Sequence, residues 1–480
     1  MVADALAGNL FCDLLAWRHE HPRRTEGRNR SLSPLLHSDY FLRPNTILAD
    51  KWQSHPHSSR VSFDPNHRVG ADPKGHAALR YERLSLSPFM PSQWRDTQRA
   101  DRMESNVVMS PPLITIVLYF FRLATAGGAE RIICQLANAM VERRFRVHLV
   151  SLDSNEAAAF YPLNTGVRWT KIGYRPGILD KLRRTLALVR LLKVNDVHAL
   201  VGFVMSGDKS IFTAAKLSGV RLAAAERNAP AMYRLRYSRV QRWISFGLLH
   251  LADRIVVQMP EYVNGYPVSL RNKILTIANP VSMARQHARP DRRNASGRFT
   301  LLAVSRLDPV QKRIGTLIGA FSHVARTHPD WDLRIIGDGP GELALRRLAE
   351  ELGISERVRM EPSVTSVFDA YAEAHLFVMP SLWEGFPNAL AEAMSHGLPA
   401  VGFDAAAGVA DLIRKGGGWL APGLDDAASL AETLSIAMDD HTQRAIRGKL
   451  AAQGMAVFTP EAVFDRWAEM LLELGPKQAL

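Results

Sequence analysis

Continuous apolar runs alternate with helix-like spacing in this chain from residue 113 onward. The run LITIVLYF at 113–120 has the unbroken apolar character of a strand that is covered on both faces. A loop and a helical pattern follow it, and the apolar run at 147–152 predicts the next strand. Because strand, helix and strand come in this order, we expect a parallel β-α-β unit at the start of a doubly wound α/β sheet.

The same alternation continues to the end of the chain. Further strands are expected at 197–204, 222–225, 255–258, 299–307, 333–336, 358–360, 374–379 and 400–402, and helices at 178–193, 314–327, 388–396 and 461–474. A polar, basic segment at 284–298 interrupts the pattern and predicts an interdomain linker. We therefore expect two Rossmann-like domains, at 113–290 and 299–460, and a last helix at 461–474.

Residues 1–112 differ from the rest of the chain. They are rich in Arg, His, Ser and Pro and have no sustained period of 3.6 or 2, so they cannot bury much apolar surface. We expect a low-complexity, basic, disordered extension. Paired histidines in it could bind a metal, but no Cys or acidic cluster joins them, and a solvated tail is the plainer interpretation.

Composition narrows the class of protein. A chain of 480 residues is too long for one core, and 47% apolar residues indicate a globular protein. Two distant cysteines, Cys12 and Cys134, form no disulfide framework and fit a reducing compartment. No apolar run reaches about 18 residues, and the start of the chain is a poor signal peptide, so we expect a cytoplasmic protein without a membrane-spanning helix.

The charge suits acidic partners. The chain has 60 Lys and Arg against 47 Asp and Glu. This net charge of +13 suits binding to phosphates, anionic lipid or nucleic acid. In the stretch 233–254, arginines are interleaved with Tyr, Trp, Phe and Leu, which suits an anionic membrane surface. The alternative is a core-facing helix with solvated arginines. Nucleic acid is not expected as a partner, because no recognised binding module accompanies the charge.

The strongest candidate chemistry lies in the stretch 380–399, which follows an apolar strand. A turn at Gly385 and Pro387 leads into a helical pattern that begins at Asn388, and a strand, a turn and a helix N-terminus in succession can bind an anion. Glu384 and Glu392 flank this positive spot, and carboxylates suit the hydroxyls of a sugar or a ribose. The stretch therefore predicts a nucleotide-sugar site; the alternative is an ordinary turn with two surface acids.

Cations and glycines at other predicted turns support this hypothesis. Arg306 and Lys312 lie on either side of the first β/α turn of the second domain, where they could hold a diphosphate. No Asp-x-Asp motif lies near, so no metal is expected. Gly127 and Gly128 allow close approach of a ligand to the backbone, but they do not form Gly-x-Gly-x-x-Gly, which disfavours a dinucleotide cofactor.

The spacing Glu384-x7-Glu392, with Gly-Phe-Pro after the first Glu, resembles the signature of family 4 glycosyltransferases of the GT-B fold. The resemblance covers about residues 113–474. Other segments also resemble the family: Gly127-Gly128-Ala129-Glu130-Arg131, Glu226-Arg227-Asn228, the segment 274–281, Arg306-x5-Lys312 and Gly337-Asp338-Gly339-Pro340. The chain departs from the family at Glu361, where a glycine near the base is usual, and at Asp411, where Glu is usual.

The resemblance implies two Rossmann-like lobes facing a cleft, with the last helix crossing back to the first lobe. It implies retaining transfer from a nucleotide-sugar co-substrate, a UDP- or GDP-sugar. The residues that it places in the site are, for catalysis, Glu384, Lys312 and Arg306; for donor binding, Glu392, Gly385, Phe386, Pro387, Asn388, Gly337, Gly339 and Ser363; and on the cleft or acceptor side, Gly127, Gly128, Glu226, Arg227 and Asn228.

Taken together, these features predict a hexosyltransferase that uses a lipid-phosphate-linked or polysaccharide acceptor in surface glycan biosynthesis. It would act in the cytoplasm, either free or at the inner face of the cytoplasmic membrane. Two alternatives stay open. One is a nucleotide-sugar epimerase of the same fold, which would act on the donor without any acceptor. The other is a non-catalytic protein that binds nucleotide sugars.

Overall fold

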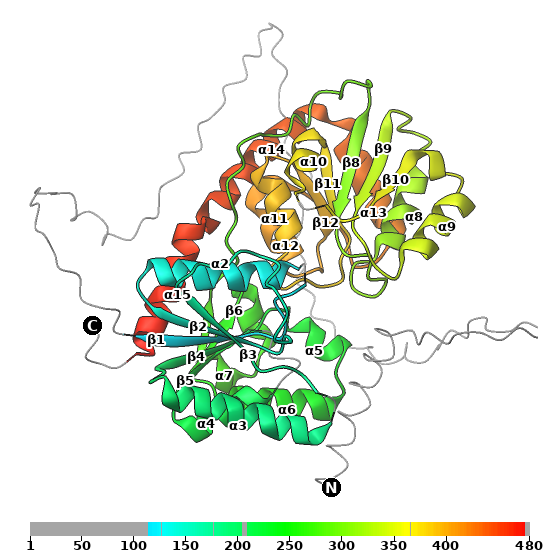
Figure 1. Cartoon of the computed structure of the whole chain (residues 1–480). Helices are drawn as coiled ribbons and strands as arrows, with labels where there is room; N and C mark the ends of the chain where they lie inside the picture. Colours follow the sequence, from blue (N-terminus) through cyan, green and yellow to red (C-terminus); the bar gives the residue numbers. More distant parts are fainter. Residues whose placement is uncertain (1–113, 126, 176, 204–208, 365, 476–480) are drawn as a thin grey trace, which may run out of the picture. The chain divides into compact units, whose positions relative to one another are not determined.

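The computed structural model describes residues 114–475 except 126, 176, 204–208 and 365 (Figure 1). All of them belong to one compact unit, residues 102–480. The extension expected at 1–112 lies outside the described residues, as does Cys12.

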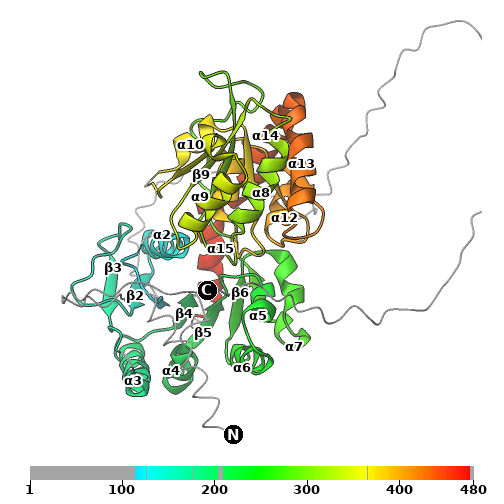
Figure 2. The ribbon, with the colours of Figure 1, turned by 90° about the vertical axis from the view of Figure 1, so that its right-hand side faces the viewer.

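The first lobe is built on a seven-stranded, wholly parallel sheet with the order β3-β2-β1-β4-β5-β6-β7. Its strands are β1 (Thr115–Tyr119), β2 (Arg146–Ser151), β3 (Val167–Lys171), β4 (Ala199–Phe203), β5 (Arg221–Ala225), β6 (Arg254–Val257) and β7 (Ile274–Thr276). Its helices are α2 (Gly128–Glu142), α3 (Ile178–Val194), α4 (Ser210–Ser218), α5 (Ala231–Leu235), α6 (Arg239–Leu249), η1 (Pro260–Gly265) and α7 (Val268–Arg271). Helices α3, α4 and α6 lie side by side in both views (Figures 1 and 2).

The second lobe is built on a six-stranded parallel sheet with the order β10-β9-β8-β11-β12-β13. Its strands are β8 (Phe299–Val304), β9 (Trp331–Ile336), β10 (Val358–Glu361), β11 (Leu376–Met379), β12 (Ala400–Phe403) and β13 (Gly418–Ala421). Its helical segments are α8 (Ile314–Val324), α9 (Glu342–Glu351), η2 (Ser355–Arg357), α10 (Phe368–Glu373), α11 (Asn388–Ser395), α12 (Val409–Leu412), the π-helical turn η3 (Ile413–Gly417), α13 (Ala427–Asp439), α14 (His441–Met455), η4 (Ala456–Phe458) and α15 (Pro460–Glu473).

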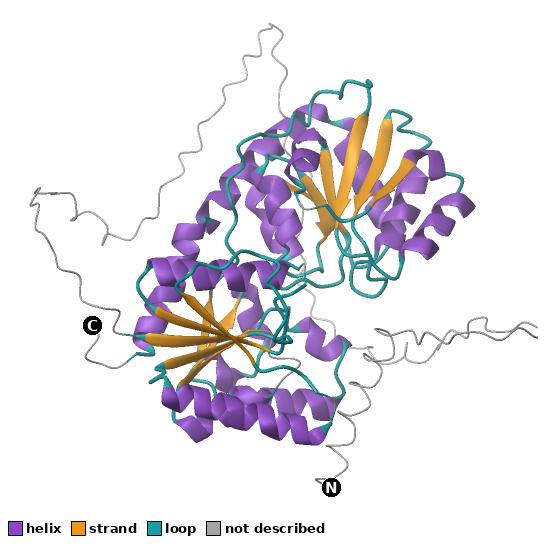
Figure 3. Cartoon of the chain, viewed as in Figure 1, coloured by secondary structure: helices purple, strands orange, loops and turns teal. Residues whose placement is uncertain are grey.

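Both sheets have the same doubly wound topology, with helices on both faces (Figure 3). In each sheet, the second and third strands follow one another on one side of the first strand, and the fourth strand lies on its other side. The direction therefore reverses between β1 and β4 in one lobe and between β8 and β11 in the other. Ligands of such sheets bind at the carboxyl ends of the strands beside this reversal. In the second lobe, the loops after β8 and β11 lie at that place.

The last helix, α15, packs on the first lobe although it follows the second lobe in sequence. Its buried side chains join the core formed by β1, β2 and α2, and its Trp467 ring stacks on Phe203 with ring centroids 5.7 Å apart. An ion pair between Arg143 and Asp465, with 2.7 Å between Nη2 and Oδ1, adds an exposed contact with α2. The chain therefore passes between the lobes twice.

The two passages meet. The first runs through Val281 into the linker, and the second runs through η4 into α15. The backbone N–H of Val281 donates to the carbonyl oxygen of Phe458 at 2.7 Å. The ring of Phe458 also packs edge-on against Phe386, with 5.5 Å between centroids. The two connections between the lobes are therefore joined by a hydrogen bond beside the turn after β11.

Two expectations from the sequence need correction. The stretch 233–254, treated above as one face, is broken into α5 and α6 because Ser238 begins a new helix through a capping box with Gln241. Strand β3 was not expected. It is an edge strand that is only partly buried, so its residues VRWTK carry no continuous apolar run.

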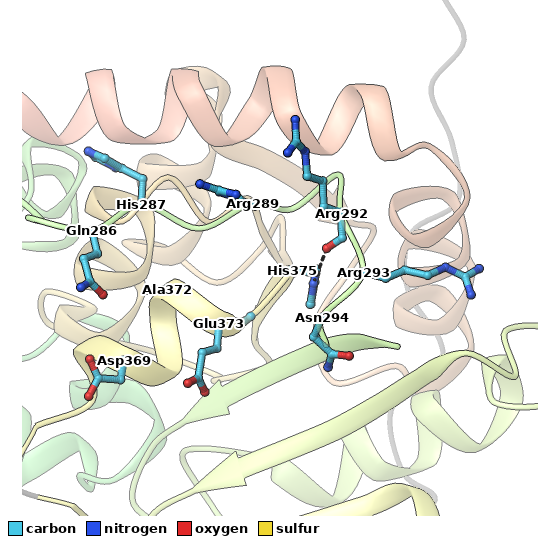
Figure 4. A pocket seen from close by; sticks show the side chains of 11 residues that line it. Gln286, His287, Arg289, Arg292, Arg293, Asn294, Asp369, Ala372, Glu373 and His375 are labelled. Atoms are coloured by element: carbon cyan, nitrogen blue, oxygen red, sulfur yellow. Dashed lines mark hydrogen bonds between the residues drawn. The ribbon is translucent and has the colours of Figure 1, made fainter. Parts of the chain in front are cut away.

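A cavity of about 640 Å³ lies along the linker, beside the amino end of β11 (Figure 4). Arg289, Arg292, Glu373 and His375 are among its lining residues. The Nδ1 atom of His375 accepts from the backbone N–H of Thr300 at 2.9 Å, so its Nε2–H donates to the carbonyl oxygen of Arg292 at 2.8 Å. Burial lowers the pKa of His375 to about 4, so this ring is a neutral structural link.

Candidate functional site

The loops after β8 and β11 bring Lys312 and Glu384 together. The Nζ atom of Lys312 lies 2.6 Å from Oε1 of Glu384. The two side chains are only 12% and 8% exposed, so this ion pair is largely shielded from solvent. A shielded charge pair at the carboxyl ends of two neighbouring parallel strands lies where a doubly wound sheet binds its ligand.

One backbone and one side-chain hydrogen bond, both made by Gln311, hold these two loops against each other. Asp308 stabilises the first loop, because its Oδ1 accepts from the backbone N–H of Val310 at 2.9 Å and of Gln311 at 2.8 Å. Gln311 then bridges to the second loop: its carbonyl accepts from Leu382 N–H at 2.9 Å, and its Nε2 donates to the Trp383 carbonyl at 3.0 Å. The position of Lys312, the next residue, therefore follows from this bridge.

Arg306 lies in the same loop, two residues after β8, and its side chain is exposed. It makes no ion pair or side-chain hydrogen bond with any residue between 114 and 475 that the structure describes. Gly337 and Gly339 pack beneath this loop. A Cβ at Gly337, where φ is +150°, would lie 1.9 Å from the Ser305 carbonyl oxygen, and one at Gly339 would lie 2.7 Å from the backbone nitrogen of Leu307. These glycines thus support the Arg306 loop by close packing.

Glu392, in α11, is contacted from two directions. Arg131 of α2 forms an ion pair with its Oε1, and the Tyr371 hydroxyl donates to its Oε2 at 3.2 Å. Burial, and then the charge of Glu392, raises the pKa of Tyr371 well above its ordinary value, so this hydroxyl stays a donor. A carboxylate has about four lone-pair positions, so each oxygen of Glu392 keeps capacity for a further donor.

The turn that contains Gly385 lies directly against the first lobe. A Cβ at Gly385 would lie 2.0 Å from the carbonyl oxygen of Arg227 and 2.4 Å from Oε1 of Gln258. The hydroxyl of Tyr262 donates to the carbonyl oxygen of Glu384. Only a residue without a Cβ fits this approach, so the glycine is explained by the contact between the lobes.

The first residue of α11 also touches the first lobe. The Oδ1 atom of Asn388 accepts from Nδ2 of Asn279 at 2.7 Å, and a Cβ at Gly128 would lie 2.8 Å from Asn388 Nδ2. A side chain at Gly128, where α2 begins opposite α11, would therefore make the Asn388 amide shift. The Asn388 backbone N–H donates to the Phe386 carbonyl at 2.9 Å, so this donor of the predicted anion site is already used.

Glu226 lies inside the first lobe. Its carboxylate is buried, and it accepts from the hydroxyl of Tyr233 at 2.6 Å and of Tyr266 at 3.2 Å. Burial raises the pKa of Glu226, and the two tyrosine hydrogen bonds oppose that shift. The family resemblance implies an acceptor-side role for this residue; in the structure its carboxylate links two tyrosines inside the first lobe. Asn228 stays half-buried at the surface of that lobe.

Four other residues expected in the site are also placed. Phe386 is buried against Phe458, and Pro387 precedes α11 as its N-cap residue. Gly127 is the extended N-cap residue of α2. The Ser363 side chain is exposed, but its backbone N–H donates to Asp338 Oδ2 at 3.0 Å. The Ser363 backbone N–H is therefore not free for a nucleobase in this conformation.

Sequence reasoning missed the roles of Arg131, Tyr262, Gln258 and Asn279. Arg131 belongs to a segment quoted above, and Asn279 lies in the segment 274–281, but neither was given a partner. In the sequence, Arg131 is only a polar residue in the first turn of a helix, and Asn279 is only a polar residue that follows a strand. Their partners lie more than 100 residues away, because Arg131 pairs with Glu392 and Asn279 with Asn388.

The described residues contain neither a cluster of metal-ligating side chains nor a membrane-spanning helix. No three His, Cys, Asp or Glu side chains gather there as a possible metal site. In the same part of the chain, no helix is both long and apolar enough to cross a bilayer.

Comparison with known proteins agrees with this geometry. Residues 298–440 match the family model described as Glycosyl transferases group 1. The chain is 25% identical to an uncharacterized glycosyltransferase of Haemophilus influenzae, over 74% of this chain and 99% of that protein. It is 23% identical to the amylovoran biosynthesis glycosyltransferase AmsD of Erwinia amylovora, over 73% and 97%. With an exopolysaccharide phosphotransferase of Streptomyces coelicolor it shares 35% identity, over 36% of this chain and only 19% of that protein.

Solved structures match the fold of both lobes. HepE of Anabaena in complex with UDP-glucose superimposes with a TM-score of 0.60 at 15% identity, over 75% of this chain and 99% of that one. At this identity the match concerns the fold alone. Residues 298–440 are therefore similar to the Glycosyl transferases group 1 family, and the described residues have a two-lobed GT-B fold.

Proposed function

We propose that this protein is a retaining family 4 glycosyltransferase that moves a hexose from a nucleotide diphosphate sugar to a lipid-linked or polysaccharide acceptor. The observation that carries the proposal is the shielded Lys312–Glu384 pair, 2.6 Å apart, at the carboxyl ends of β8 and β11. It provides a cation for a phosphate beside a carboxylate for a sugar hydroxyl. The group 1 match over 298–440 covers both residues.

In this proposal, side chains stabilise the charge of the leaving group. When the glycosyl–phosphate bond breaks, negative charge grows on the departing diphosphate, and preorganised donors there lower the barrier most. Lys312 has three N–H donors and uses one on Glu384, so two are left for phosphate oxygens. Arg306, two residues after β8, has an exposed side chain whose planar guanidinium could donate two parallel hydrogen bonds to a phosphate. The proposed donor is a UDP- or GDP-sugar, and the proposed mechanism uses these cations without a metal ion.

The two carboxylates would bind the two ends of the donor. Glu384 uses Oε1 on Lys312, so Oε2 is available for a hydroxyl of the transferred hexose. Glu392 would accept from the ribose hydroxyls while Arg131 and Tyr371 fix its orientation. With an ion pair on one side and a hydrogen bond on the other, the position of Glu392 is set before the donor arrives.

Retention would follow from attack on the face that the diphosphate leaves. The acceptor oxygen forms a bond to the anomeric carbon as the bond from that carbon to the phosphate oxygen breaks. The proton of the acceptor hydroxyl passes to that phosphate oxygen. Glu384, the carboxylate beside the proposed reacting centre, is bound by Lys312, which favours binding a hydroxyl over nucleophilic attack.

Relatives point to a glycan acceptor. AmsD is named for amylovoran biosynthesis, and the Streptomyces relative is named for exopolysaccharide. By extension, we propose that the present protein helps to assemble a surface glycan at the cytoplasmic side of the membrane. Its acceptor would be a lipid-phosphate-linked glycan.

Turnover with a panel of donors tests the function. The full chain is incubated with UDP- and GDP-hexoses, with and without lipid-phosphate-linked glycans, and release of the nucleoside diphosphate is measured. We expect release that depends on acceptor and a product with the anomeric configuration of the donor, as read by NMR. Conversion of a donor to its epimer without acceptor would establish the epimerase instead. Binding without any turnover would leave a non-catalytic protein.

The first lobe has a surface that suits an anionic membrane. On α3, Leu179 and Leu182 are 78% and 57% exposed, and on α6, Trp243 is 77% exposed. Exposed basic residues, among them Lys193 and Arg239, belong to the same two helices. Exposed apolar side chains among basic ones allow a helix to lie at a bilayer interface, with cations at the lipid phosphates.

Trp243→Ser should weaken binding to anionic vesicles. In a flotation assay with phosphatidylglycerol-containing liposomes, we expect the unaltered chain to float and the variant to bind several-fold less, since the ring loses its apolar contact. Leu343→Ser is the matched control, because Leu343 is 63% exposed but lies on α9 of the second lobe. Equal flotation of all three proteins would exclude this surface as the membrane contact.

A further inference from the structure

Arg227 occupies an unusual position for a cation. It follows β5, at the carboxyl edge of the first sheet, and its backbone carbonyl contacts Gly385 of the second lobe. Its guanidinium carbon lies 4.8 Å from the centroid of the Phe203 ring. The aromatic ring covers one side of the cation, and the turn after Glu384 lies next to its backbone.

The guanidinium of Arg227 lacks a full set of acceptors. Its Nη2 donates to Oδ1 of Asn279, but its Nη1 is buried and has no acceptor within the described residues. No carboxylate there forms an ion pair with Arg227. Burial lowers its pKa to about 9, and no neighbouring acid opposes that shift. A buried cation that lacks a counter-ion favours the binding of an anion.

Gln258 adds a second incomplete group beside it. Its Nε2 donates to the same Asn279 Oδ1 at 3.0 Å, so the Gln258 amide and the Arg227 guanidinium converge on one atom. Its Oε1 is buried and has no donor within the described residues. Asn279 is itself bonded to Asn388, the first residue of α11. The incomplete groups are therefore connected to the turn that is proposed to hold the donor.

We propose that Arg227 is a third cation of the donor site, supplied by the first lobe, and that its free Nη1 pairs with an oxyanion of the bound donor. This rests on the proposed function. Arg227 as a residue is only half-buried, and rotation about the last bonds of its side chain would turn Nη1 toward a ligand. The oxyanion is a diphosphate oxygen or, for a uronic acid donor, the carboxylate of the sugar, because both match the guanidinium fork.

Calorimetric titration of the full chain tests the proposal and separates the two sources. The ligands are UDP, UMP, GDP, GMP, UDP-glucose and UDP-glucuronate. If the partner is the diphosphate, Arg227→Gln weakens binding of the preferred nucleoside diphosphate by about 10- to 100-fold and leaves the monophosphate unchanged. If it is a carboxylate, the variant loses the preference for UDP-glucuronate over UDP-glucose and keeps its affinity for UDP. Arg227→Lys should fall between the two, since it keeps the charge but not the fork.

Gln258→Glu is a second variant that does not remove the cation. It puts a carboxylate beside the Asn279 amide that Arg227 also contacts, so Arg227 gains an internal counter-ion and competes less well for the ligand. Because the change also removes the Nε2–H donor to Asn279, a thermal melt first establishes that the variant is folded. We expect the same loss of affinity as in Arg227→Gln. Arg347→Gln, an exposed arginine of α9, is the control and should bind as the unaltered chain does.

The outcomes are distinct. If folded Arg227→Gln and Gln258→Glu bind every ligand as tightly as the unaltered chain, the role of Arg227 is refuted while the proposed function stands. If the unaltered chain itself binds none of these nucleotides, both the proposed function and this inference fail.

Discussion

Lys312→Ala should lower the rate of acceptor-dependent diphosphate release by about 100-fold or more at saturating donor. The variant removes a cation proposed to stabilise charge that grows only as the glycosyl–phosphate bond breaks, so the loss should appear in kcat. It also leaves Glu384, which is 8% exposed, without its ion-pair partner. Initial rates at saturating donor and acceptor measure the effect, and a thermal melt checks that the variant is folded.

Two further variants show whether the effect belongs to the ion pair. Glu384→Gln keeps the shape of the side chain and loses its charge, and it should also reduce kcat. If the two residues act together, the double variant should lose much less than the product of the two single losses. Lys449→Ala removes an exposed lysine of α14 and should leave the rate unchanged. A folded Lys312→Ala with an unaltered kcat would contradict the proposed mechanism.

Gly385→Ala should have the other large effect, because the added Cβ meets atoms that cannot easily move. It would lie 2.0 Å from the backbone oxygen of Arg227 and 2.4 Å from Gln258 Oε1, well inside van der Waals contact. Overpacking of this kind costs about 1–3 kcal/mol of stability. Since Glu384 is the preceding residue, the forced shift should also move its carboxylate, and displacement of about 1 Å in a site can lower the rate about 100-fold.

A lower melting temperature and a lower kcat/KM measure the two consequences of Gly385→Ala. Gly247→Ala is the matched control: a Cβ at this glycine of α6 meets no atom within 4 Å, so the protein should keep its stability and its activity. If Gly385→Ala retained both properties, the close approach of the turn to the first lobe would not describe the protein in solution.

The two-lobed fold was predictable because its central strands are buried on both faces. Strands β1 and β4, for example, are buried along their whole length, so each appears in the sequence as a nearly continuous apolar run. Strand β3 escaped the same reasoning because its edge position leaves every residue partly exposed. Residues 233–254 were likewise treated as one face, because no Gly or Pro marks the break between α5 and α6. The break is made instead by the capping box of Ser238.

Within the site, the sequence could predict the positions of those residues that follow directly after strands. Lys312 and Glu384 both follow adjacent parallel strands, so the topology alone brings their loops to one edge. The ion pair of Arg131 with Glu392 depends on how two separate sheets are placed, which no local pattern records. Glu226 was assigned to the acceptor side by the family resemblance alone. That its carboxylate accepts from two tyrosine hydroxyls inside the lobe is likewise recorded in no local pattern.

The hydrogen bond between Val281 and Phe458 has a consequence for motion. Two connections that were far apart would resist twisting, whereas two that touch at one point act mechanically as a single pivot. Any reorientation of one lobe against the other would then be a swing about that point, with displacements that grow with distance from it. Because Phe386 packs on Phe458, the neighbouring turn lies close to the axis, and its residues would travel least while the outer loops sweep farthest.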